Sequence, residues 1–549
     1  MNEEQKMAIQ EIMESEAAKE IAYISAYPTI PYFLIDKEFT GNIANSFKNE
    51  FGEIMNYYAV YHFGNRFVPE GSNGDYIPSL LRYKKAAMIL NKEARFFFSN
   101  PPSFNVNVDD VTGEFSEENA IIQNYLDKVL ELTNFHGNLL KAVKDCFIGK
   151  RIAIVVNFTE SNKIAIKFLK STDFLYQYGD DEELEKFIAF YETTGSNQLT
   201  EQRWFRKSYV KEKGVVYLTE DIWDGAGELI ETVCKKKQIA LSEIPAVVIT
   251  NDGLLGNTRG VSELTYNMDY EAYYSKLANS DMDAERKSMH PIRYTIDASE
   301  KSTRNLPTSP GSYWDLQTDE EKPNEGSYVA KVGTIEAQMN YSNPLKVTLD
   351  RIENEMYAEL DVPNITSEQL AGVITSGKTI QALYWGLTVR CDEKMLAWAY
   401  GLRTIAYIII EGGKVYRNCI KRYTDAESIP DIPYDVLVEN NYPIPEDEKE
   451  EKELDITEIE AKVLSRKAYL KKWRKLNDKE AASELEQIKL ESEMLDNTYL
   501  NYTTSDSVSK ADQDEQEAMD NVDEQFEKDT PNYTVLQEGQ SANARNVNG

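Results

Sequence analysis

The chain has 549 residues, 93 of them acidic and 60 basic, so its formal net charge at pH 7 is −33. Proteins gain affinity for nucleic acid by neutralising phosphates, so this charge excludes an ordinary nucleic-acid-binding surface. The length predicts several domains, and no stretch approaches the roughly 20 consecutive apolar residues of a membrane span. The acidic N-terminus lacks the pattern of a signal peptide, so we expect a cytoplasm-like compartment.

The cysteines and histidines do not have the spacing of metal ligands. They are scattered singly along the chain, at Cys146, Cys234, Cys391 and Cys419 and at His62, His136 and His290. We therefore expect reduced thiols, no metal site and no cofactor.

The pattern of the first half changes at Arg151 from helical to strand-like. Helical apolar spacing over Ile43–Phe63, Ser79–Phe98 and Glu117–Cys146 predicts a packed helical subdomain. Short β-like runs then follow at hairpin distances, which predicts an antiparallel β layer. These runs are Ile152–Phe158, Ile164–Leu169, Phe187–Glu192, Trp204–Val210, Val215–Thr219, Leu229–Val233 and Ala246–Thr250.

Two helical segments with an irregular segment between them come next. Val261–Met289 is helical in composition and ends before Pro291, which disfavours helix at the preceding residue. Ile292–Met339 mixes β and turn character. A second helix starts at Ser342-Asn-Pro344, in the favoured order of cap followed by proline.

The segment that follows permits two incompatible interpretations. Gly372-Val-Ile-Thr-Ser-Gly-Lys-Thr379 matches the phosphate-binding loop of ATPases. Such a loop needs a buried strand before it, whereas Thr366-Ser-Glu-Gln369 has the capping-box spacing of a helical turn. The other interpretation, which we favour, is a loop before a long helix with Ser376 as its N-cap. Apolar residues recur at every third or fourth position from Ile380 to Ile409, which is a helix stripe.

The C-terminal part is strongly charged. Strand-like residues Tyr434–Glu439 precede the acidic run Glu446–Glu453, and helical patterns return over Ile456–Leu500. Beyond Thr503 the composition is polar and acidic, which predicts disorder.

The order of these elements resembles that of the portal proteins of tailed double-stranded DNA phages, in particular the type found in long-tailed phages of Gram-positive hosts. Glu243–Asn251 through Gly260–Leu264 is similar to the family's strand and the start of its stem. Val362–Ile365 through Gly377 and the long helix after it resemble the tunnel loop and its following kinked helix. Val463–Leu470 is similar to the start of the family's C-terminal helices. The likeness runs from about Asn42 to Leu500.

This resemblance implies an α+β, multi-domain portal fold with nine parts. They are an N-terminal helical arm (1–41), a wing of helices and antiparallel β layer (42–260), stem helix one (261–289), a small α/β clip (290–341), stem helix two (342–360), a tunnel loop (361–376), a long helix with a return to the wing (377–455), a helical crown (456–502) and a disordered acidic tail (503–549).

The resemblance also implies a function without catalysis. The protein would form a ring, usually of twelve copies, at one vertex of the capsid, after assembly in the host cytoplasm. Double-stranded DNA would be packaged and ejected through the ring. Terminase large subunit, a head-completion or adaptor protein, capsid protein and scaffolding protein would be its partners, and no membrane is involved. A P-loop ATPase using Gly372–Thr379 and a soluble scaffold unrelated to phage are the alternatives.

Three groups of residues are candidates for the site. Strong cationic contacts would slow a moving phosphate backbone, whereas acids would keep it centred and hydrated. The candidates for the stem are Asp269, Glu271, Asp281, Asp283 and Glu285, which an ordinary solvated helix face would explain equally well. The tunnel-loop candidates are Asn364, Ile365, Thr366, Ser367, Glu368, Gln369, Thr375 and Lys378. Aromatic residues favour interface centres, so the clip candidates for partner contact are Tyr313, Trp314 and Tyr328, for which a core role is at least as plausible.

Overall fold

The computed structural model describes residues 31–69, 78–107, 117–159, 162–194, 201–289, 292–300, 314, 316–318, 329–335, 339–365, 377–444, 448–474 and 481–490. The chain divides into two compact units, Met1–Glu446 and Asp447–Gly549. The described residues mix helices with antiparallel sheets, which confirms the α+β class.

The first unit begins with helices packed into one hydrophobic core. They are α2 (Tyr32–Glu38), α3 (Gly41–Phe63), α4 (Lys85–Phe98), α5 (Glu117–Leu132) and α6 (Phe135–Gly149). The helical prediction is confirmed with two corrections. Residues 79–84 are not helical, because their backbone binds side chains of another helix. The predicted helix Glu117–Cys146 is interrupted at Asn134, whose φ of 50° is left-handed.

Two antiparallel sheets follow the helices, where the sequence predicted a single β layer. One has the strand order β3-β2-β9, with β2 (Arg151–Phe158) between β3 (Ile164–Lys170) and β9 (Ala246–Thr250). The other has the order β4-β5-β6-β7-β8. Its strands are β4 (Phe174–Tyr178), β5 (Leu184–Thr194), β6 (Arg203–Glu212), β7 (Val215–Asp224) and β8 (Leu229–Gln238). All seven strand-like runs are confirmed. Strand β4 was missed because it has only five residues and lies between two turns.

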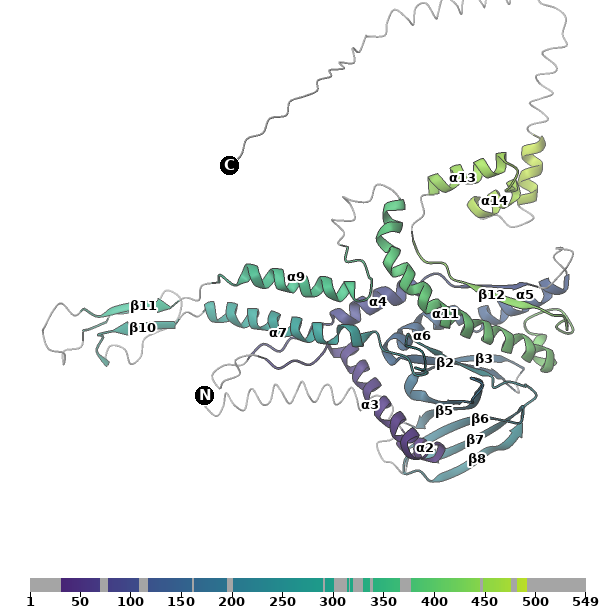
Figure 1. Cartoon of the computed structure of the whole chain (residues 1–549), viewed down its shortest axis with the longest axis horizontal. Helices are drawn as coiled ribbons and strands as arrows, with labels where there is room; N and C mark the ends of the chain where they lie inside the picture. The colour runs from purple at the N-terminus through teal and green to yellow at the C-terminus, as the bar shows by residue number, and fades with distance from the viewer. Residues whose placement is uncertain are drawn as a thin grey trace, which may run out of the picture. The chain divides into compact units, whose positions relative to one another are not determined.

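Two helices, α7 (Leu264–Ser288) and α9 (Ser342–Ala358), then pack side by side, with a small hairpin at their far end (Figure 1). The hairpin pairs β10 (Ile292–Ile296) with β11 (Lys331–Ile335), in a register that sets Ile292 opposite Ile335. Met356 and Leu360 near the end of α9 are buried in the core. The chain therefore leaves the helix-and-sheet body along α7 and returns to it along α9.

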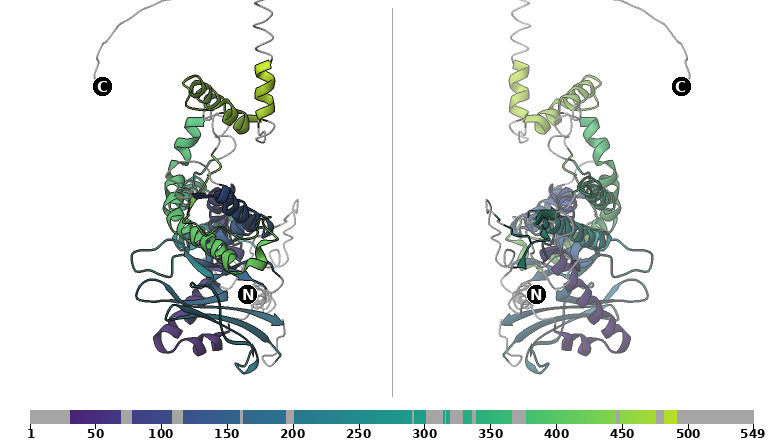
Figure 2. Two further views of the ribbon diagram at one scale, coloured as in Figure 1. Left: turned by 90° about the vertical axis from the view of Figure 1, so that its right-hand side faces the viewer. Right: turned by 90° about the vertical axis from the view of Figure 1, so that its left-hand side faces the viewer.

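The longest helix, α11 (Gly377–Val415), has 39 residues and bends along its length (Figure 2). Its predicted stripe is confirmed, because Leu387, Cys391, Trp398 and Leu402 are at most 1% exposed. At Gly412 a β-carbon would overlap the ring of Phe158, so only glycine allows this close approach between α11 and β2. A short helix, α12 (Arg417–Ile420), and strand β12 (Asp435–Glu439) follow, and β12 pairs with β1 (Ser103–Asn107).

The second unit contains α13 (Glu448–Glu460), α14 (Arg466–Arg474) and the helical residues 481–490. The acidic run that the sequence analysis placed before the C-terminal helices is itself helical from Glu448 onward. Asp455 on α13 joins α13 to α14, since it accepts a hydrogen bond from the Trp473 indole at 2.6 Å and pairs with Lys472 at 3.1 Å.

None of the described helices combines the length and the hydropathy that crossing a membrane requires.

Candidate functional site

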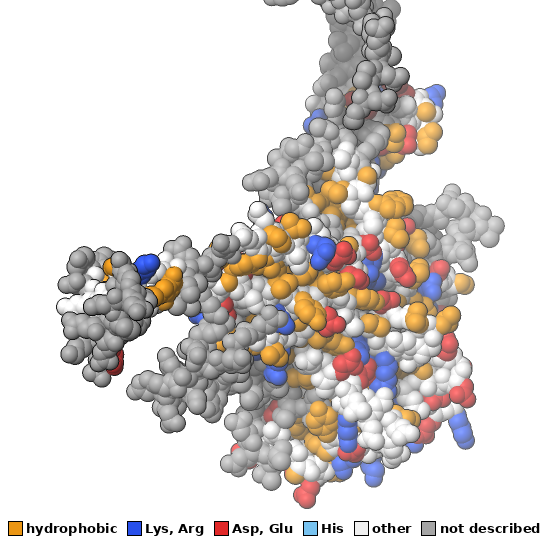
Figure 3. Space-filling model, turned by 60° about the vertical axis from the view of Figure 1, so that its left-hand side comes forward, with side chains coloured by type: hydrophobic (Ala, Val, Ile, Leu, Met, Phe, Trp, Pro, Cys, Tyr) orange, Lys and Arg blue, Asp and Glu red, His pale blue; other side chains and the backbone are white. Residues whose placement is uncertain are grey.

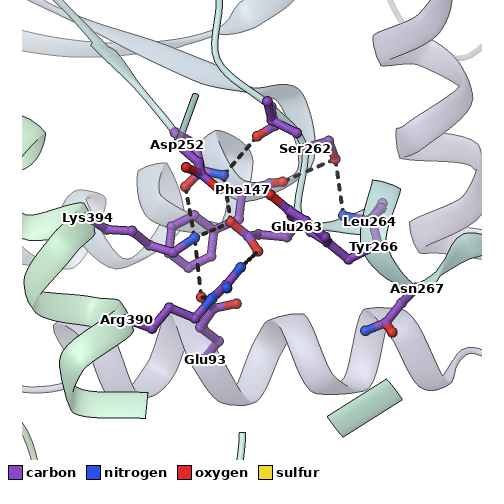
Figure 4. A network of polar contacts seen from close by, with 12 residues as sticks. Glu93, Phe147, Asp252, Ser262, Glu263, Leu264, Tyr266, Asn267, Arg390 and Lys394 are labelled. Atoms are coloured by element: carbon purple, nitrogen blue, oxygen red, sulfur yellow. Dashed lines mark hydrogen bonds and ion pairs between the residues drawn. The ribbon is translucent and has the colours of Figure 1, made fainter. Parts of the chain in front are cut away.

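Four charged side chains meet where α7 begins, at a place we call the junction: Glu93 of α4, Glu263 before α7, and Arg390 and Lys394 of α11 (Figure 4). The amide of Asn251, after β9, completes it. Arg390 donates from Nη2 to Glu263 Oε2 at 2.6 Å and from Nε to Glu93 Oε1 at 3.1 Å. Lys394 also pairs with both carboxylates. The amide of Asn251 donates to Glu263 at 2.7 Å and accepts from Lys394 at 3.2 Å. The junction thus ties three helices and a strand end together.

The junction buries ionic side chains, so its stability depends on how well they pair with one another. Glu93 and Glu263 are fully buried, and Lys394 is 5% exposed at its side chain. Taking such ions out of water costs several kcal/mol each, and mutual attraction offsets this only if the geometry is good. A device of this kind fixes one position of α11 against α4 and α7.

The two junction carboxylates have opposite pKa shifts. Burial and the adjacent charge of Glu263 raise the pKa of Glu93, whose Oε2 has no hydrogen-bond partner. Burial also opposes ionisation of Glu263, but Lys394 and Arg390 outweigh it and hold the pKa of that carboxyl below its usual value. Glu263 is therefore the ionised centre of the junction, and Glu93 is the group that can take up a proton.

A second buried polar feature, the α7 ladder, lies along one face of α7. Its five members recur at every fourth residue and are at most 5% exposed: Asn267, Glu271, Ser275, Asn279 and Asp283. Four of them bind the backbone of the segment that precedes and starts α4. Asp283 accepts from the N–H of Ser79 at 3.0 Å, Asn279 from Leu81 at 2.8 Å, Ser275 from Tyr83 at 3.2 Å and Glu271 from Ala86 at 2.9 Å.

Glu271 is a helix cap supplied from another helix. Its second oxygen accepts from the N–H of Asn65 at 3.0 Å, while Ala86 belongs to the first turn of α4, whose own N-cap makes no side-chain hydrogen bond. Burial raises the pKa of Glu271 to about 7, although these backbone N–H groups lower it.

The ladder contains two of the five acids predicted for the stem. Glu271 and Asp283 are buried and bind the backbone of Ala86 and Ser79 within the same chain. Asp269 and Glu285 are exposed on α7. Asp281 is half-buried, and its charge adds to burial in raising the pKa of Tyr341. The five acids differ in exposure because one face of α7 binds residues 79–86, and that face buries Glu271 and Asp283.

Most of the predicted loop contacts lie outside the described residues. These are Thr366, Ser367, Glu368, Gln369 and Thr375. The backbone of Lys378 lies in the first turn of α11, and its side chain is not among the parts that the structure describes. Asn364 is exposed and donates to Asn354 of α9 at 2.9 Å, and Ile365 is half-buried. Tyr313 and Tyr328 are also outside the described residues, and Trp314 is half-buried.

The ATPase interpretation finds no support in the described part of the chain. A phosphate-binding loop needs a buried strand before it. The last element described before Gly372 is helix α9, and the described residues 362–365 after it form no strand. A phosphate-binding loop also works with a carboxylate at the end of a buried strand, and the hydrophobic run Ile408–Glu411, which ends in a carboxylate, lies within helix α11 instead. Helix α11 begins at Gly377, and the predicted N-cap, Ser376, lies outside the described residues.

Charges of both signs are interspersed with hydrophobic side chains on the face shown in Figure 3. The described surface on this face therefore lacks the one-sided basic character of a nucleic-acid-binding groove.

The architecture defines a structural class of protein, in which a helix pair tipped by a hairpin extends from a helix-and-sheet body and a long helix crosses that body. The family model for phage portal proteins of the SPP1 Gp6-like type matches residues 42–498. The chain belongs to this family of phage capsid components. No curated protein matches the chain.

Sequence reasoning missed both the junction and the α7 ladder. The ladder had a signal, namely five polar residues at exact i, i+4 spacing on one helix. The junction had only a partial one, because Arg390 and Lys394 share a helix face but their acidic partners are far away in sequence.

Proposed function

We propose that this protein is a portal subunit that assembles into a ring at one capsid vertex, and that double-stranded DNA passes through the ring during packaging and ejection. The observation that carries the proposal is the family match over residues 42–498. It agrees with the element order of helix, hairpin, helix, loop and long helix.

In this proposal each part of the chain has a role in the ring. α7 and α9 form the stem, residues 290–341 the clip, residues 361–376 the tunnel loop and residues 42–260 the wing. Residues 377–455 form the long helix and its return to the wing, 456–502 the crown, 1–41 an N-terminal arm and 503–549 an acidic tail.

The channel lets DNA move because its side chains bind the phosphates only weakly. The exposed acids Asp269 and Glu285 face the passage, where they repel phosphates and keep the duplex centred and hydrated. The loop from Asn364 to Thr375 narrows the passage with small polar side chains, and Lys378 at the start of α11 supplies one cationic contact. Because Pro363 and Gly377 flank the loop, it changes position while α9 and α11 stay in place.

The junction gives α11 the fixed base that such a loop needs. Arg390 and Lys394 lie on the same helix that begins immediately after the loop, and both are bound to buried carboxylates. Movement at the loop therefore leaves Arg390 and the rest of α11 in place.

The clip is the docking surface for the proteins that bind the vertex one after another. Terminase large subunit binds there during packaging, and a head-completion or adaptor protein binds there afterwards. Capsid and scaffolding proteins contact the outside of the ring. Trp314 and the aromatic residues Tyr313 and Tyr328 supply apolar contact area for these partners.

Negative-stain images of the purified full chain test the proposal. Rings with a central hole are expected. If only monomers or small oligomers are seen as the protein concentration is raised, the proposal is refuted.

A further inference from the structure

The solvent-facing side of α11 carries an apolar stripe, Trp385, Val389, Leu396 and Tyr400, which we call the outer stripe. These side chains are 69%, 48%, 75% and 65% exposed. At 3.6 residues per turn they fall within an arc of about 60° on one side of the helix. A surface helix ordinarily presents charged and polar residues on that side, and a helix that is apolar on both sides is a buried helix.

Small and charged residues flank the outer stripe. Ala382, Gly386 and Ala397 are exposed beside it, and so is Glu393. Asp392 at the edge of the stripe accepts a hydrogen bond from Tyr442 at 2.8 Å, and the Arg403 guanidinium lies 5.9 Å from the centre of the Tyr400 ring. An apolar patch of Trp, Tyr and Leu with charged residues at its edge has the composition of an interface.

A second apolar feature lies in the turn between β9 and α7. Leu254 and Leu255 are 88% and 107% exposed, the highest values among the described large hydrophobic residues of their compact unit. The turn is ordered, since Leu254 C=O accepts from the N–H of Asn257 at 2.8 Å and the Asn257 side chain accepts from the N–H of Arg259 at 3.0 Å. An ordered turn presents its two leucines without an ordering cost on binding.

One chain cannot bring these two features together. Asn251, at the base of the turn, binds Lys394, which lies about 180° around α11 from Trp385. The turn therefore starts on the buried side of α11, and the outer stripe is on the opposite side. Two different patches on opposite sides of one element generate a head-to-tail contact, which closes into a ring when the rotation between subunits allows.

We propose that the outer stripe is a subunit interface, and that the Leu254–Leu255 turn of the adjacent copy of this chain binds to it. This inference rests on the proposed function, since it names the contact that joins neighbouring subunits. The interface places α11 between the junction on its inner side and a neighbouring subunit on its outer side.

Cross-linking of assembled full-length protein tests the contact. The background is Cys234→Ser, because the other three cysteines are buried. In the double variant Leu255→Cys/Leu396→Cys, a short bis-maleimide should give a ladder of covalent multimers on a denaturing gel. Each single variant should give none. The matched control Leu255→Cys/Leu132→Cys, in which Leu132 is 48% exposed on α5, should also give none.

A second measurement removes the apolar contact. Trp385→Ser/Leu396→Ser should raise the concentration at which half of the protein is assembled by more than about tenfold, equivalent to ~1.4 kcal/mol. Its circular dichroism should match that of the unmodified monomer. Rings that form normally in this variant, or rings that give no ladder in the cysteine pair, overturn the inference. If the unmodified protein forms no rings at all, the proposed function fails instead.

Discussion

Asn279 binds both backbone groups of Leu81: its Oδ1 accepts from the Leu81 N–H at 2.8 Å, and its Nδ2 donates to the Leu81 C=O at 2.6 Å. The pairing repeats along α7 because two spacings match. Four residues of helix rise about 6 Å, and two residues of extended chain span about 6.6 Å. Side chains at every fourth helical position therefore meet alternate backbone groups of the extended segment at Ser79, Leu81 and Tyr83.

Removing the Asn279 amide should loosen this segment. Asn279→Ala leaves the N–H and C=O of Leu81 without their partners, and we expect a loss of about 1–3 kcal/mol in the free energy of unfolding. Denaturant unfolding of the unassembled protein measures it. Asp269→Ala is the matched control, since Asp269 is exposed on the same helix, and its effect should stay within about 0.5 kcal/mol. Equal effects of the two substitutions would contradict the ladder.

The Glu271 cap predicts a pH dependence of stability. The pKa of Glu271 is raised from its usual value of 4.5 to about 7 in the folded protein, so between these two values the folded state holds a proton that the unfolded state releases. Stability from this group is then complete below the unfolded pKa and is lost as pH rises through the folded pKa. We expect Glu271→Ala to cost more at mildly acidic than at alkaline pH. Thermal unfolding of the unmodified protein and of Glu271→Ala, in the same buffers across this pH range, measures the loss of stability. A loss that grows as the pH rises would contradict the raised pKa of Glu271.

The sequence alone predicts those helices and strands in which the spacing of apolar residues decides which side is buried. The α11 stripe and the seven strand-like runs were predicted because apolar residues recur at 3.6 or 2 positions, and this spacing sets which side faces the core. Residues 79–84 were wrongly predicted as helix because their pattern continues into α4. What holds them extended is the side chains of α7, about 200 positions later in the chain.

Charged residues were the part that periodicity could not resolve. Glu271 and Asp269 are two positions apart and have similar chemistry, yet one is buried and the other exposed. A carboxylate is assigned to solvent by default, since burial costs several kcal/mol unless partners are supplied. For Glu271, Glu93 and Glu263 those partners come from distant segments, which one sequence does not identify.

Breaking the junction should be strongly destabilising. Arg390→Met removes the partner shared by two buried carboxylates, and we expect a loss of about 3–5 kcal/mol in the free energy of unfolding. Glu93→Gln should cost less, because the pKa of Glu93 is already raised and Glu263 keeps both cations. Denaturant unfolding ranks the two. Arg417 is exposed, so the control Arg417→Ala should have little effect on the free energy of unfolding. A similarly small effect of Arg390→Met would show that the junction does not stabilise the fold.

The hairpin at the end of α7 and α9 can be disrupted on its own. Gly333 on β11 lies opposite Tyr294 on β10, and a β-carbon at Gly333 would overlap the Tyr294 ring. Gly333→Val should therefore displace the aromatic ring and separate the strands, while rings still assemble. If the hairpin docks terminase, stimulation of terminase ATPase by the rings should fall. Thr334→Val, an exposed neighbour on the same strand, is the control, and full stimulation by Gly333→Val rings would argue against docking at this hairpin.

Shortening the loop before α11 separates ring assembly from DNA handling. Deletion of 367–370 removes four residues between α9 and α11 and leaves Arg390, Lys394 and the outer stripe in place. Because the junction fixes α11 independently of the loop, we expect rings of unchanged diameter in negative stain. DNA packaged per particle, or DNA retained after packaging, should fall, since fewer polar groups then contact the duplex in the channel. Quantification of genome content in particles built with the deletion variant measures this, with Asn364→Ala as a control that keeps the loop length. Normal genome content and normal retention would show that the loop does not act on DNA.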